Sequence, residues 1–194
     1  ISTEVYLNAT RTVGIDGTSA ADLTKGEISE RRHVQELMET LKNQVPGFEK
    51  SHLLYTAPVG IRESRNISGV YLLTMEDVIS GRQFPDSIAR GAYPIDIHDP
   101  KGGRTQFKFI DRNGSYSIPY RSLQTNEIEN LLVAGRCLSA THEAMGSARI
   151  MGAAMAQGQA AGTAAALAAA QGVSPKALDI RLLQKALKKD GALL

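Results

Sequence analysis

The sequence predicts a mixed α/β fold (an α+β segment), in which a β-rich stretch is followed by a closing strand and a helix. Two observations carry this prediction. Short strand-like runs separated by turn residues recur through residues 1–129. The apolar run NLLVAGR (130–136) then leads into residues 146–172, where 17 of 27 positions are Gly or Ala. This order places a bare helix directly behind a buried strand.

The N-terminal part is expected to contain strand-like chain and one amphipathic helix. EVYLNATRTVGI (4–15) reads as a strand or two, followed by a turn at DGTSAAD. Thr24 and Glu27 have the spacing of a capping box, which predicts a helix near 25–45. Pro46-Gly47 would end this helix. Its apolar face follows the helical repeat at Val34, Leu37, Met38, Leu41 and Val45.

The middle part is expected to consist mostly of strands. HLLYTA (52–57), ISGVYLLT (67–74) and YPIDIHDP (93–100) read as strands, and Thr74 suggests a short capped helix after the second. Asn113-Gly114 stands between the runs QFKFID and SYSIPY. Because Asn-Gly favours the tight turns of hairpins, these two runs are expected to pair with each other.

The C-terminal part is expected to contain a buried strand, the Gly/Ala helix and a last helix. NLLVAGR reads as the strand, and Ser174-Pro175 predicts the start of the last helix, with Gly191 after its end. The least polar run, AAGTAAALAAA, covers 11 residues, well short of the roughly 20 of a membrane span, so no span is predicted. The last helix should turn four leucines inward: Leu178, Leu182, Leu183 and Leu187.

Composition argues against some classes of partner. Lys and Arg number 22 against 20 Asp and Glu, and the two signs are interspersed. The sequence therefore shows no electrostatic footprint of a nucleic-acid or anionic-membrane partner. Cys137 is the one cysteine, which excludes an internal disulfide framework. No targeting signal is visible in a chain that begins without Met, so the compartment stays open.

The bare helix has two explanations. Small residues allow close packing of a helix on a sheet, and this accounts for its later turns. At its first turn, Gly152, Ala153 and Ala154 would also let a flat ligand approach the backbone N–H groups, where a helix carries partial positive charge. Arg149 stands there among small residues, which suits an anionic or electron-accepting ligand.

Other constellations are weaker. Asp96, His98 and Asp99 resemble metal ligands, but no second cluster matches them, so no metal is expected. His142 and Glu143 have the chemistry of an acid–base pair, although such neighbours are commonly solvated loop residues. The sequence contains neither a GxSxG elbow nor a GxxxxGK[ST] phosphate loop.

The residues from NLLVAGRCLSATHEAMGSARIMGAAMAQGQAAGTAAALA resemble the C-terminal signature of FAD-dependent oxidoreductases. GIDGT, PGFE, IRESRNISGVYLLTMEDV, FPDSIARGAYPIDIHDP and IPYRSL are similar to stretches of the same family, in the same order. The resemblance implies the closing strand and helix of a two-domain, glutathione-reductase-like fold. The GxGxxG of that fold is absent, so the chain is expected to be a C-terminal part whose N-terminal half is missing.

The resemblance also implies a site. Negative charge that hydride transfer leaves on the flavin would be stabilised by the start of the Gly/Ala helix. It implies that Arg149, His142 and His98 are catalytic and that Arg62, Arg65, Tyr120 and Arg121 bind substrate. The residues expected to bind FAD are Ala134, Gly135, Arg136, Ile150, Met151, Gly152, Ala153 and Ala154.

These expectations define three segments and one leading function. Residues 1–129 form the substrate-side part, 130–173 the closing strand and flavin-facing helix, and 174–194 the last helix. The enzyme would pass a hydride from a small organic substrate to FAD, with the N-terminal half as partner. The alternatives are a non-catalytic fragment that cannot hold FAD alone, and a flavin-dependent enzyme that modifies nucleic acid, which the absence of a basic stripe disfavours.

Overall fold

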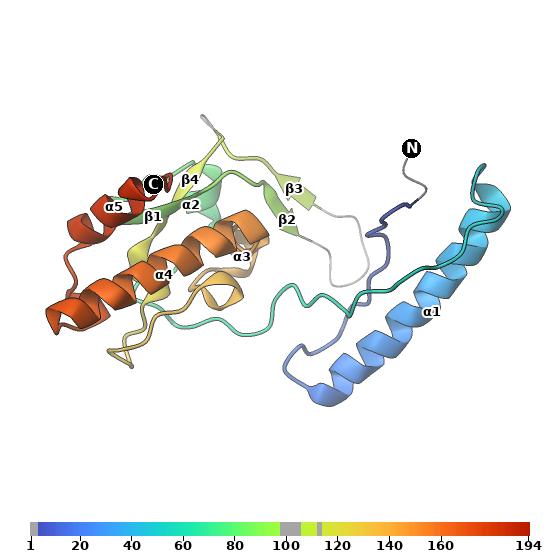
Figure 1. Cartoon of the computed structure of the whole chain (residues 1–194), viewed down its shortest axis with the longest axis horizontal. Coiled ribbons are helices and arrows are strands. Elements are labelled where there is room, and N and C mark those ends of the chain that lie inside the picture. Colours follow the sequence, from blue (N-terminus) through green and yellow to red (C-terminus); the bar gives the residue numbers. More distant parts are fainter. Residues whose placement is uncertain (1–3, 98–105, 112–113) are drawn as a thin grey trace. The chain divides into compact units, whose positions relative to one another are not determined.

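The computed structural model describes residues 4–97, 106–111 and 114–194 and divides the chain into two compact units, Ile1–Ser64 and Arg65–Leu194 (Figure 1). The expected boundary after residue 129 falls inside the second unit, where the segments on both sides contribute to one apolar core. The predicted strand residues 98–100 and the turn residues Arg112 and Asn113 lie outside the described residues.

The first unit is built around helix α1 (Ala20–Gln44). The helix begins before the cap expected at Thr24, because Ser19 caps it instead: the Ser19 Oγ accepts a hydrogen bond from the Asp22 N–H at 3.3 Å. Val45 ends the helix just ahead of Pro46-Gly47, as predicted.

The predicted strands at 4–15 and 52–57 are wrong for this structure, since both segments run as irregular chain. A strand needs a hydrogen-bonded neighbour, and no described segment pairs with either one. Their apolar side chains also lack a core: Tyr6 is 91% exposed and Tyr55 is 76% exposed. Polar contacts to α1 hold the unit instead, such as the Val59 N–H that donates to Glu27 Oε1 at 2.7 Å.

The second unit contains two short antiparallel sheets. β1 (Ser87–Gly91) pairs with β4 (Tyr116–Pro119), and β2 (Ile95–Ile97) pairs with β3 (Gln106–Lys108). The predicted hairpin between QFKFID and SYSIPY is therefore wrong, because the two runs belong to different sheets. β4 is buried along its whole length, and pairing with β1 gives its backbone groups partners inside the core.

Two other predicted strands are reduced to single bridges. Residues 67–74 form isolated bridges at Gly69–Thr125 and Leu73–Ala140, and NLLVAGR forms one at Leu132–Gln124. The chain from Gly135 to Cys137 is a 3-10 turn, η2. No described strand lies beside NLLVAGR to complete a ladder. The short helix predicted after Thr74 is confirmed as α2 (Met75–Ile79), with a complete capping box.

The Gly/Ala stretch forms two helices rather than one. α3 (His142–Ala148) ends at Arg149, and α4 (Met151–Gln171) follows it and ends at Gly172 in the left-handed conformation. α4 packs on β1 and against α5 (Ile180–Lys189) (Figure 1).

The last helix differs from its prediction in two ways. Ser174-Pro175 begins only a 3-10 turn, η3 (Pro175–Ala177), and Asp179 caps α5 itself. Leu178, Leu183 and Leu187 are buried as predicted, but Leu182 is 41% exposed. The later start of α5 turns Leu182 toward solvent.

Among the described residues, the largest fully buried side chain is that of Tyr116 on β4. Its hydroxyl lies 2.9 Å from Ser147 Oγ, and the Ser147 hydroxyl donates to the Tyr93 carbonyl. Burial raises the pKa of Tyr116 to about 12, against a smaller lowering by the Ser147 hydrogen bond. Gly91 faces the ring: a Cβ at this position would lie 2.4 Å from Tyr116 Cζ. Only glycine leaves room for this ring.

Candidate functional site

The start of α4 differs from the starts of the other α-helices in the described chain. Side-chain oxygens of Ser19, Thr74, Thr141 and Asp179 cap α1, α2, α3 and α5, whereas the N-cap of α4 is Ile150, which makes no such bond. The Ala154 N–H makes the first bond within α4, to Ile150 O at 2.8 Å. The N–H groups before it point out of the helix end as donors.

Small residues keep this helix end open. Met151 is 83% exposed, and a Cβ added to Gly152 would meet no atom within 4 Å. Ala153 is buried against the unit and Ala154 is half-buried, so the helix start has one anchored face and one open face. The open face gives a flat group direct access to the backbone.

The expected residues 134–136 lie beside this helix start. Gly135 has a φ of 65°, a left-handed conformation that favours glycine, and a Cβ there would lie 3.7 Å from the Ala154 Cβ. The Leu138 N–H closes the turn on Gly135 O at 3.1 Å. Ala134 is half-buried and Arg136 is exposed. The structure therefore brings both expected FAD-binding segments together.

Arg149 lies at the junction of α3 and α4, where it is half-buried. Its backbone N–H donates to Met145 O and ends α3. Its Nη2 atom lies 3.4 Å from the carbonyl oxygen of Asp96, on β2. Arg149 thus immediately precedes Ile150, the N-cap of α4, and its guanidinium also contacts the β2 backbone.

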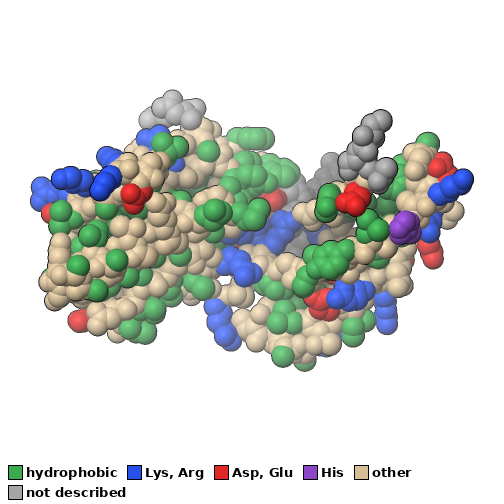
Figure 2. All heavy atoms as spheres, in the orientation of Figure 1, with side chains coloured by type: hydrophobic (Ala, Val, Ile, Leu, Met, Phe, Trp, Pro, Cys, Tyr) green, Lys and Arg blue, Asp and Glu red, His purple; other side chains and the backbone are tan. Residues whose placement is uncertain are grey.

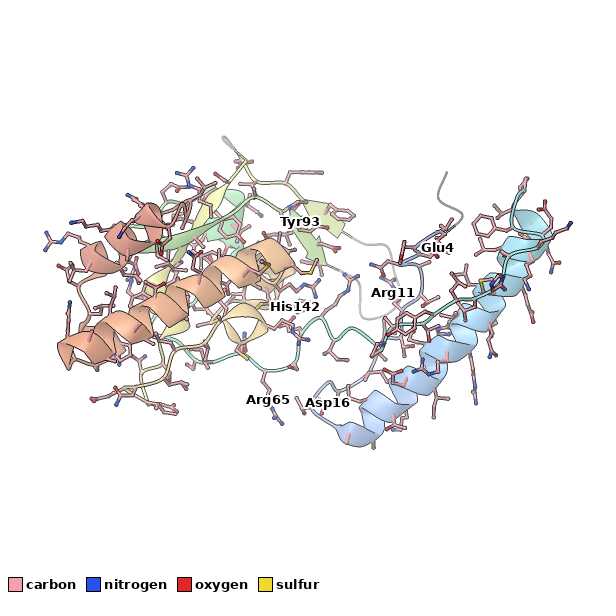
Figure 3. All side chains as sticks on the ribbon, in the orientation of Figure 1. Glu4, Arg11, Asp16, Arg65, Tyr93 and His142 are labelled. Atoms are coloured by element: carbon pink, nitrogen blue, oxygen red, sulfur yellow. The ribbon has the colours of Figure 1, made fainter. Side chains whose placement is uncertain are left out.

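The other expected polar residues are spread over the chain. His142 is the first residue of α3 and is exposed, and Arg65 is exposed and points away from the helices of its unit (Figure 3). Arg62 lies in the first unit, and His98 lies outside the described residues.

Tyr120 and Arg121 have structural partners. The Tyr120 side chain is buried and its hydroxyl donates to Pro175 O at 3.0 Å, which ties the turn that follows β4 to the C-terminal segment. The Arg121 guanidinium donates to both carboxylate oxygens of Asp86, at 2.9 and 3.2 Å, and lies over the Tyr71 ring. Both side chains hold elements of the fold together.

Asp77 is a buried carboxylate that was not among the functional residues expected from the sequence. It contacts Tyr71, the ring that Arg121 covers. Asp77 is 4% exposed and accepts hydrogen bonds from Tyr71 and Arg82, both at 2.8 Å, and from the Thr74 N–H. Burial raises the pKa of Asp77, but the hydrogen bonds from Thr74, Arg82 and Tyr71 outweigh it and hold the pKa below its ordinary value. The capping-box spacing after Thr74 was the available signal for this residue.

Gln157 is a second residue that sequence reasoning passed over. It is fully buried on α4, and its amide contacts both the Gly135 turn and the end of α3. The available signal was its place in the helical repeat of otherwise small buried residues: Ala153, Gln157, Ala160, Ala164 and Ala168.

The charge distribution leaves α4 uncharged. No Asp, Glu, Lys or Arg occurs between Arg149 and Lys176. In Figure 2 the visible face of the second unit is mostly uncharged, with Lys and Arg side chains at its α5 edge. Arg149 is therefore the one charged side chain adjoining the start of α4 in the sequence.

The described residues hold no group of three or more His, Cys, Asp or Glu side chains placed to bind a metal ion. In the same part of the chain, every helix is too short or too polar to cross a membrane.

The donor set at α4 fits one kind of group. Outward N–H groups, the positive end of a helix dipole of 21 residues and a neighbouring arginine favour an electron-rich or anionic edge. The open face at Gly152 and the glycine turn at 135 leave room for a planar ring. These features match the chemistry of a flavin ring edge.

A model of the family described as FAD dependent oxidoreductase matches residues 2–187, nearly the whole chain. Neither a curated protein nor a solved structure matches the chain.

Proposed function

Because the chain belongs to the FAD-dependent oxidoreductase family, with FAD as its cofactor, we propose that residues 1–194 are the C-terminal part of an enzyme that oxidises a small organic substrate. FAD supplies the acceptor for a hydride when it is bound. The partner of these residues is the N-terminal half of the same protein, which carries the GxGxxG strand–turn–helix for the ADP moiety.

The observation that carries this proposal is the uncapped start of α4 beside the Gly135 turn. Ile150 to Ala154 would offer N–H donors to the electron-rich edge of the ring, and Ala134 to Arg136 would border it from the turn. Donors that are fixed before reaction stabilise negative charge as it develops, without reorganisation. Removal of one such donor raises a barrier by about 3 kcal/mol.

The proposal gives Arg149 the role of holding an anionic group of the substrate. A guanidinium offers a planar fork of donors that matches a carboxylate. Its place between α3 and the open start of α4 supports this role, and the contact to Asp96 O limits its movement. His142, Arg65, Tyr120 and Arg121 remain candidates for the rest of the pocket, and the sequence-based assignments of His98 and Arg62 remain predictions.

The exposed apolar side chains of the first unit support the proposal that another part of the protein completes residues 1–194. Gly26 is the one buried residue among those described in Ile1–Ser64, and strand-like segments there expose Tyr6, Leu54 and Tyr55. Large exposed apolar side chains on unpaired segments are typical of a surface that another part of the protein covers.

Visible spectra test the proposal. The intact protein and residues 1–194 alone are each incubated with FAD, desalted and scanned for the flavin band. We expect the band in the intact protein and little or none in residues 1–194, because the pyrophosphate contacts come from the N-terminal half. Tight FAD binding by residues 1–194 alone would contradict the fragment assignment, and an intact protein without flavin would contradict the proposed function.

A further inference from the structure

Gln157 is the one polar side chain on the buried line of α4, whose other members are alanines. It is fully buried. Burial of a side-chain amide costs free energy unless its donors and acceptor are satisfied, so an apolar residue would be the simpler choice here. Packing alone therefore does not explain why glutamine occupies position 157.

Both ends of the Gln157 amide bond to the backbone of other elements. Its Oε1 accepts from the Gly135 N–H at 2.8 Å, and its Nε2 donates to Ala148 O at 2.9 Å. A backbone N–H can only donate and a carbonyl can only accept, so these partners fix the orientation of the amide. One side chain thus spans three elements: η2, α3 and α4.

The two backbone groups border the candidate site. Gly135 is the left-handed centre of the turn that faces Ala154. Ala148 is the last residue of α3 and immediately precedes Arg149. The Gln157 amide therefore sets the position of the turn and of the Arg149 junction relative to the first turns of α4. It cannot touch a ligand itself, because it has no exposed surface.

We propose that Gln157 is a positioning residue for flavin binding, which rests on the proposed function of the start of α4. Its amide holds the Ala134–Arg136 turn and the α3–α4 junction at the spacing that the ring requires. Without the amide, α4 still packs through its alanines, but the turn loses the acceptor for the Gly135 N–H. The Ala134–Arg136 turn and the α3–α4 junction, which border the flavin, are then no longer held at a fixed spacing.

Gln157→Met tests this role, with Gln159→Met as the matched control. Methionine has nearly the volume of glutamine and removes both hydrogen bonds. Gln159 is exposed on the same helix. Two readouts are taken in the intact protein: amide hydrogen exchange at Gly135 without FAD, and the dissociation constant for FAD.

We expect Gln157→Met to speed exchange at Gly135 and to weaken FAD binding by about tenfold, the loss expected for one or two hydrogen bonds. The amides of Ala160 and Ala164 should keep their wild-type exchange rates, and Gln159→Met should change neither readout. Should Gln157→Met fail to fold, Gln157→Leu replaces it. Leucine also removes both hydrogen bonds, so exchange at Gly135 should again be faster than in the wild type, and unchanged exchange would overturn the proposal.

Unchanged exchange at Gly135 in Gln157→Met would overturn the proposal, because the contact would then not hold the turn. Faster exchange with unchanged FAD affinity would also overturn it, while the proposed function would stand because the wild type binds FAD. A wild-type intact protein that binds no FAD would overturn the proposed function, and this role with it, whatever the exchange rates.

Discussion

Gly91→Ala should lower the free energy of unfolding by about 2–4 kcal/mol, the sum expected for overpacking and a disturbed buried hydrogen bond. Gly91 and Tyr116 are cross-strand partners on β1 and β4, and an added Cβ would lie 2.4 Å from Tyr116 Cζ. The ring cannot swing away freely, because it is fully buried and its hydroxyl contacts Ser147. Denaturant unfolding followed by circular dichroism measures the change.

Gly158→Ala is the control for that experiment. It makes the same substitution on α4, where an added Cβ meets no atom within 4 Å. Alanine favours a helix interior over glycine by about 1 kcal/mol, so this variant should be slightly more stable than the wild type. A Gly91→Ala variant as stable as Gly158→Ala would show that the Tyr116 ring is not held as described.

Arg149→Lys should slow reduction of the bound flavin by substrate by about 10–100-fold, equivalent to one or two charge-assisted hydrogen bonds. Lysine keeps the positive charge but loses the planar fork of donors that fits an anionic group. Flavin content and spectrum should be unchanged, because the N–H donors of α4 belong to the backbone. Anaerobic rapid mixing with an organic acid that bleaches the wild-type flavin gives the rate.

A melting curve separates this role from a structural one. Arg149 also contacts the backbone of β2, so a purely structural residue would lower the melting temperature and leave the reduction rate at its wild-type value. Thermal stability close to that of the wild type, together with a slower rate, supports the role in substrate binding. If both quantities stay at their wild-type values, Arg149 has neither role.

The helices could be predicted from the sequence better than the strands. Local signals decide helices: the periodic apolar residues of α1 and the capping box at Thr74 lie within a few residues of each other. Strands depend on distant partners, so the Asn113-Gly114 signal could not show that β3 pairs with β2 and β4 with β1. Residues 4–15 have strand-like composition, but no described segment pairs with them.

The sequence indicated backbone features of the candidate site, but it did not indicate the side-chain contacts between residues far apart in the sequence. Gly152, Ala153 and Ala154 indicated an approachable backbone, the family resemblance added Gly135, and the structure places the two segments beside each other. Tyr120 and Arg121 have polar side chains typical of a pocket, but their structural partners, Pro175 and Asp86, are far away in the sequence. The role of Gln157 could not be predicted for the same reason, because its partner Gly135 is 22 residues away in the sequence.

The central claim, that the flavin ring lies against the first turn of α4, is tested most directly by the flavin content of Gly152→Leu beside that of Gly162→Leu. Both glycines have open space at the Cβ position, and Gly162 lies about 15 Å farther along the helix. The intact variants are purified, and the flavin absorbance per protein is compared at equal FAD. We predict FAD binding weaker by about tenfold in Gly152→Leu, from crowding at the ring, and wild-type binding in Gly162→Leu. A folded Gly152→Leu variant that holds as much flavin as Gly162→Leu would contradict the claim.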